Sequence, residues 1–141
     1  MTTRAEFIAE ARSWIDTPYH HQARVKGAGV DCVGLPLETA RHFGLTDFST
    51  EAYSTYPDGE SLLALCRTHL SPIPKLAIAP GDVVLIRFQR NPHHLALVGD
   101  YLYGGLSLIH ADSTLGRVVE HRLDEVWRRL IVAAFAVPGL Y

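Results

Sequence analysis

Residues 94–110 read HLALVGDYLYGGLSLIH and give the clearest indication of how the chain folds. Two apolar runs, 94–98 and 106–110, flank a glycine-containing connection, which is the pattern of an antiparallel β-hairpin. A symmetric pairing places residue 98 opposite residue 106, and His94 opposite His110. Directly opposed side chains share one face of a sheet, about 5 Å apart. The hairpin therefore predicts that the two histidines are neighbours, although a one-residue slip would move one of them to the other face.

The rest of the chain predicts helices first and strands afterwards. Apolar residues recur at helical spacing in three early segments, at about 3–15, 31–43 and 60–69. The later segments predict further strands at 83–88, 117–121 and 131–137, with a short helix at about 123–129. This order favours one α+β domain over residues 1–141, in which N-terminal helices pack on an antiparallel β-sheet of about five strands.

Turn and cap residues separate these elements. Asp31 is the predicted N-cap of the second helix, and Gly44 is its predicted C-terminal stop. Pro72, Pro74 and Pro80 are expected to break the segment before the first long strand. Residues 45–58 show no clear period, and we expect them to border the cleft.

Composition limits the classes of partner. The formal net charge is -2 and the isoelectric point is about 6.4. The sequence therefore gives no sign of a basic surface, and a nucleic-acid partner is not expected. No stretch approaches the roughly 20 apolar residues of a membrane span, so membrane insertion is not expected. The first residues lack the basic head and apolar core of a signal peptide, which predicts synthesis in the cytoplasm without one.

The two cysteines have different surroundings. Cys32 lies between a glycine-containing loop and a predicted helix, where backbone N–H groups and the helix dipole stabilise a thiolate. Cys66 lies within an apolar helical run and is expected to serve packing alone. A chain of this length needs no disulfide, so we expect two separate thiols.

We predict a catalytic group of three residues, with Cys32 as the nucleophile, His94 as the base and His110 as the orienting group. In this interpretation the Cys32 thiolate attacks a carbonyl carbon and His94, as its imidazolium partner, later protonates the leaving amine. His110 fixes the tautomer of His94. The same three residues leave a zinc site open as an alternative, although paired ligand spacings such as CxxC or HxxxH are absent. The preferred chemistry requires no metal and no other cofactor.

Four short blocks carry a resemblance to a known family. In chain order they read TPY at 17–19, DCVGL at 31–35, HLALV at 94–98 and IHA at 109–111. Together they resemble the NlpC-type cell-wall cysteine peptidases, which have a papain-like fold. The resemblance implies hydrolysis of amide bonds in peptidoglycan stem peptides, with the D-γ-glutamyl-diamino acid link as the favoured target. It also implies that Tyr19 lines the oxyanion hole or a subsite, and that Asp31 contacts the amine of an L-alanine.

Further residues resemble one branch of that family, whose members are encoded in phage tail gene clusters. They are 18–24 (PYHHQAR), Arg87-Phe88 and Trp127-Arg128-Arg129. This branch implies tail-tip proteins as partners, a place in the virion, and action on the cell wall from outside. Two alternatives stay open: a structural tail-tip or assembly protein with little turnover, and an acyltransferase that forms the same thioester.

Overall fold

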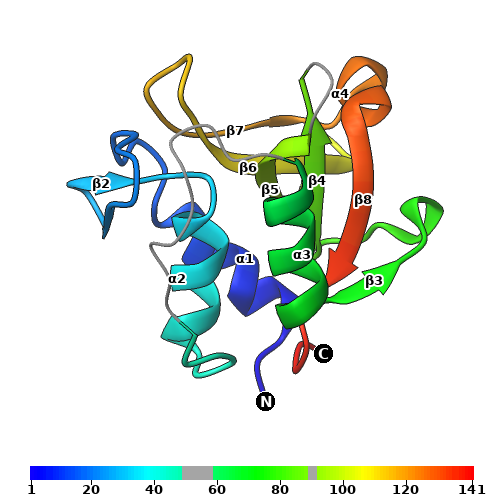
Figure 1. The fold of residues 1–141 in the computed structure, drawn as a ribbon, viewed down its shortest axis with the longest axis horizontal. Helices are drawn as coiled ribbons and strands as arrows, with labels where there is room; N and C mark the ends of the chain where they lie inside the picture. Colours follow the sequence, from blue (N-terminus) through cyan, green and yellow to red (C-terminus); the bar gives the residue numbers. More distant parts are fainter. Residues whose placement is uncertain (49–58, 89–91) are drawn as a thin grey trace.

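The computed structural model of the protein describes residues 1–48, 59–88 and 92–141. In chain order the elements are α1 (Arg4–Arg12), β1 (Arg24–Val25), β2 (Gly29–Val30), α2 (Gly34–His42), α3 (Gly59–His69), β3 (Ser71–Ile73), the 3-10 turn η1 (Lys75–Ala77), β4 (Val83–Arg87), β5 (Pro92–Asp100), β6 (Leu106–Asp112), β7 (Arg117–Arg122), α4 (Glu125–Leu130) and β8 (Ile131–Ala136). Figure 1 shows α1, α2 and α3 gathered on one side of the strands, which confirms the predicted α+β architecture.

The main sheet of the described residues has six strands in the order β3-β8-β4-β5-β6-β7, and each neighbouring pair is antiparallel. Five of these strands match the predicted ones. The sixth, β3, was expected to be broken by proline. Pro72 fits there because β3 is an edge strand, where a missing N–H need not disrupt the ladder. A separate hairpin of β1 and β2 was not predicted.

The hairpin of β5 and β6 has a different register from the symmetric one. Val98 lies opposite Leu108, two residues from the predicted partner. The cause is that β5 continues to Asp100, so the turn is shorter: the N–H of Tyr101 donates to the carbonyl of Gly105 at 2.9 Å. Because a shift of two residues keeps each side chain on its face, His94 and His110 still share one, as diagonal neighbours.

The core is divided between the two faces of the sheet. Phe7, Ile8 and Ala11 of α1 pack with Leu35 of α2 against strand residues such as Leu97, all of them buried. The opposite face buries a second cluster that includes Ala96 and Leu108, with Trp127 and Leu130 of α4 packed on it: its strand members are Val84, Ile86, Ala96, Val98, Leu108, Ile131 and Ala134. Alternation along β5 therefore sends neighbouring side chains into different layers.

Local signals explain how the helices begin and end. Thr3 and Glu6 form a reciprocal capping box at the start of α1, which ends at Arg12, earlier than predicted. Gly44 follows α2 with a φ of +69°, as expected of the residue after a helix. None of the helices in the described part of the chain is both long and apolar enough to span a bilayer.

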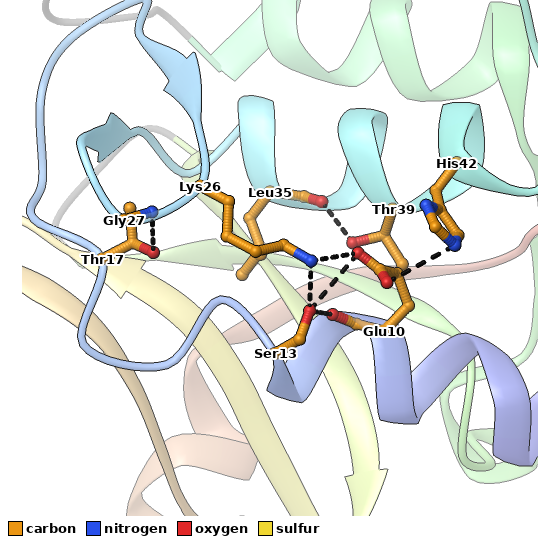
Figure 2. A network of polar contacts seen from close by, with 8 residues as sticks. All are labelled: Glu10, Ser13, Thr17, Lys26, Gly27, Leu35, Thr39 and His42. Atoms are coloured by element: carbon orange, nitrogen blue, oxygen red, sulfur yellow. Dashed lines mark hydrogen bonds and ion pairs between the residues drawn. The ribbon is translucent and has the colours of Figure 1, made fainter.

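A polar network fastens the long loop after α1 to both neighbouring helices (Figure 2). The Lys26 ammonium donates to Glu10 of α1 at 2.7 Å and to Ser13 at 2.5 Å. His42 of α2 lies 3.5 Å from the same Glu10 carboxylate. Thr17 accepts the backbone N–H of Gly27 at 3.0 Å. These contacts hold the loop that leads into Cys32.

Candidate active site

Cys32 lies between β2 and α2, and the residue is only 7% exposed. The backbone N–H of Leu95 donates a hydrogen bond to its sulfur, as do the N–H groups of Cys32 itself and of Val33 in the turn before α2. Since β5 and β6 pair from Leu97 to Asp100, this contact lies where β5 precedes that pairing. The sulfur is therefore beside the backbone of the residue that follows His94.

The charge state of Cys32 differs from the predicted one. Burial raises the pKa of the Cys32 thiol to about 12, and the negative charge of Asp31 adds to this effect. The N–H groups of Leu95 and of the helix start lower the pKa, as predicted, but desolvation outweighs them. Burial therefore acts against the predicted thiolate and favours the neutral thiol.

Cys66 confirms its predicted structural role. It lies on α3, is 2% exposed and belongs to the helix-side core. Burial raises the pKa of its thiol to about 12 as well. Both cysteines are free thiols, so the expectation of no disulfide is confirmed.

The two predicted histidines meet as expected. Nε2 of His94 and Nδ1 of His110 lie 2.8 Å apart, and the two residues are 7% and 1% exposed. Burial lowers the pKa of His110 to about 4, and repulsion from His121 contributes to this shift. His110 is therefore neutral at pH 7, which suits a group that orients another ring.

Asp31 is not the N-cap of α2 as predicted, since that position is Val33, but it holds the turn before the helix. Its Oδ1 accepts the N–H of Gly34 at 2.8 Å, although α2 begins only at Gly34 and residues 32–33 form a turn. Its Oδ2 accepts the N–H of Gln22 at 2.6 Å, and His21 lies 3.7 Å away. Gln22 has a φ of +62°, a left-handed conformation that costs energy for a residue with a side chain. The buried carboxylate thus fixes the loop after Tyr19, and contact with a substrate amine stays a prediction.

Tyr19 is held in the same region by its backbone. Its N–H donates to the carbonyl of Gly116 at 2.8 Å, and it forms a bridge with Val30 of β2. Burial raises the pKa of the Tyr19 phenol, and the negative charges of an ionised Cys32 and of Asp31 raise it further. The phenol therefore keeps its proton at neutral pH and can donate a hydrogen bond near Cys32.

Three residues beside the histidines were not predicted as part of the site. His121 on β7 lies with its Nε2 2.8 Å from Nε2 of His110. The Trp127 ring of α4 is 4.6 Å from the His121 ring, and the Phe88 ring is 5.4 Å from His94. A signal for His121 existed: pairing the predicted strands 106–110 and 117–121 symmetrically puts residue 121 on the face of residue 110.

A largely apolar cavity of about 120 Å³ lies between α2, α3 and the sheet. Leu45, Thr46 and Phe48 line it, together with Val33 and Leu95. The prediction that 45–58 border the cleft falls partly on 49–58, which are outside the described residues. Among the residues that are described, no group of three or more His, Cys, Asp or Glu side chains is arranged to hold a metal ion.

Known structures share this arrangement of elements. The NlpC/p60 domain of the peptidoglycan hydrolase SagA superposes with a TM-score of 0.67 at 21% identity, covering 96% of this chain and all of that one. An NlpC/P60 family protein from Bacillus cereus gives a TM-score of 0.67 at 18% identity, and this chain spans 39% of its length. This chain has the fold of the NlpC/p60 domains.

A third similar structure is the P60 domain of an antigen from M. avium subspecies paratuberculosis. Its TM-score is 0.61 at 16% identity, covering 95% of this chain and 93% of that one. No protein-family model and no curated protein sequence matches the chain. The NlpC/p60 fold predicted from four short blocks is thus confirmed. These comparisons do not concern the phage tail branch, which stays a prediction.

Proposed function

We propose that this protein is a cysteine peptidase that hydrolyses amide bonds of peptidoglycan stem peptides. The observation that carries the proposal is the 2.8 Å contact between His94 and His110, next to a Cys32 sulfur that accepts the N–H of Leu95. The NlpC/p60 fold supports the same reading, because the similar SagA domain comes from a peptidoglycan hydrolase.

The geometry suggests base-assisted attack by a thiol. His94 takes the proton of Cys32 as its sulfur bonds to the carbonyl carbon of the substrate. The imidazolium then returns that proton to the leaving amine as the carbon–nitrogen bond breaks, which leaves a thioester. Water, deprotonated by His94, cleaves the thioester to a carboxylic acid and restores the thiol. The neutral Tyr19 phenol is the proposed donor to the oxyanion.

The finer assignments are further parts of the proposal. The preferred bond is the link between the γ-carboxyl of D-glutamate and the diamino acid, and the setting is a phage tail. Tail-tip proteins are the proposed partners, and the virion carries the enzyme to the cell wall. Purified particles of the phage that encodes this chain test the setting: mass spectrometry should detect the chain with tail proteins, and its absence would contradict this part.

One observation favours a different class of function. Cys32 is only 7% exposed and its thiol is neutral, as expected of a structural tail-tip protein that keeps the fold without turnover. The two are separated by incubating isolated sacculi with the wild type, Cys32→Ala and Cys66→Ala. We expect stem-peptide fragments from the wild type and from Cys66→Ala only. No fragments from the wild type would exclude the peptidase, and transfer to an added amine would favour the acyltransferase.

A further inference from the structure

His121 extends the pair of histidines into a row of three imidazoles. Nε2 of His94 lies 2.8 Å from Nδ1 of His110, and Nε2 of His110 lies 2.8 Å from Nε2 of His121. At the far end, Nδ1 of His121 lies 3.0 Å from the carbonyl oxygen of Arg122. Each ring thus uses defined nitrogens toward its neighbour, and the row ends on a backbone group.

That backbone group determines the positions of the protons. A carbonyl oxygen only accepts, so Nδ1 of His121 carries the proton and its Nε2 is the acceptor. Nε2 of His110 must then donate, which leaves its Nδ1 to accept from Nε2 of His94. A neutral imidazole has one N–H, so His94 keeps an unprotonated Nδ1.

We infer that His121 is a positioning residue that sets the tautomer of His94 through His110, so that Nδ1 of His94 is the base toward Cys32. This inference rests on the proposed function for its effect on turnover, but the tautomer itself does not depend on that function. The role matters because Cys32 is a thiol at rest, so its proton must be accepted by a nitrogen that carries none.

The surroundings keep the middle ring, His110, neutral and hold the row in place. The Trp127 ring packs against two of the three histidines, with centroid distances of 5.4 Å to His110 and 4.6 Å to His121. The Phe88 ring meets the Trp127 ring edge-on, with the two centroids 5.7 Å apart. Burial and repulsion from His121 lower the pKa of His110, while Asp112 acts in the opposite direction. The aromatic residues Phe88 and Trp127, which resemble the phage branch in sequence, therefore enclose the histidines.

The first test is the tautomer of His94 in the wild type. Imidazole nitrogens with and without a proton differ widely in 15N chemical shift, so 15N-histidine-labelled protein reports the state of each ring near pH 8. We expect a proton on Nε2 of both His94 and His110, and on Nδ1 of His121. A proton on Nδ1 of His94 in the neutral ring would overturn the inference, whether or not the protein hydrolyses sacculi.

The second test uses a matched pair of variants. His121→Leu keeps the bulk but offers no acceptor, whereas the amide oxygen of His121→Gln reaches about as far as Nε2 and can accept from His110. We expect His121→Leu to give mixed His94 tautomers and at least about a tenfold loss of turnover, and His121→Gln to restore both. Unchanged tautomers in a folded His121→Leu would contradict the inference. So would equal turnover of wild type and His121→Leu, whereas no turnover by the wild type would contradict only the proposed function.

Discussion

Replacing His110 with asparagine should remove a defined part of the dependence of stability on pH. Burial and the neighbouring His121 lower the pKa of His110 from 6.5 to about 4 in the folded protein. Between these two pH values the unfolded chain binds a proton at this position and the folded protein does not. Stability is therefore lost as the pH falls from about 6.5 to about 4, with a slope of about 1.4 kcal/mol per pH unit and a total of about 3 kcal/mol.

The assay is urea unfolding of the wild type and His110→Asn at several pH values between 4 and 8. The variant loses hydrogen bonds and is less stable throughout, so the informative quantity is the slope of the unfolding free energy against pH, not its value. His20→Asn, at an exposed histidine, is the control and should keep the wild-type slope. An equal slope for His110→Asn and the wild type between pH 4 and 6.5 would show that His110 does not cause this loss of stability.

Three further predictions concern the support of the fold. Arg12→Met should lower the free energy of unfolding by about 2 kcal/mol, because it removes the two contacts at 2.9 and 2.8 Å that Arg12 makes with the Glu120 carboxylate and leaves that charge without its cation; a chemical denaturation curve equal to that of the wild type would contradict this. Gly99→Ala should cost about 1–3 kcal/mol, since its Cβ would come within 2.6 Å of the Ser107 hydroxyl, and an unchanged thermal midpoint would argue against that overlap. Phe7→Ala, which empties a fully buried position, should cost about 3–5 kcal/mol by urea unfolding, and a loss below about 1 kcal/mol would show that the site collapses.

Much of the fold follows from local signals that the sequence displays. Alternating apolar runs predicted five of the six strands, and side-chain parity placed His94 and His110 on one face even though the register was wrong by two residues. The register error arose because Gly99 was assigned to the turn, whereas in the structure it continues β5. Its pairing with β6 determines this, and glycine by itself does not favour a strand. The edge strand containing Pro72 was also missed because pairing forms it: its partner, β8, is distant in sequence, so no local pattern indicates the strand.

The electrostatics of the site depended on tertiary packing, which the sequence displays less directly. The helix start at Cys32 predicted a thiolate, but the core that surrounds the sulfur reverses the balance in favour of the thiol. The sequence did not single out His121 among its eight histidines, because the role of His121 comes from its contacts with His110 and with the carbonyl of Arg122. The fold therefore changed the expected mechanism from a preformed ion pair to base-assisted attack.

Intact-protein mass spectrometry can detect the thioester that we propose between Cys32 and the stem peptide. The protein is mixed with purified stem-peptide fragments, quenched in acid within the first turnover, and digested to locate any added mass. We expect an acyl adduct on Cys32, absent from Cys32→Ala and present in Cys66→Ala. Hydrolysis of the fragments by Cys32→Ala at the wild-type rate would contradict it.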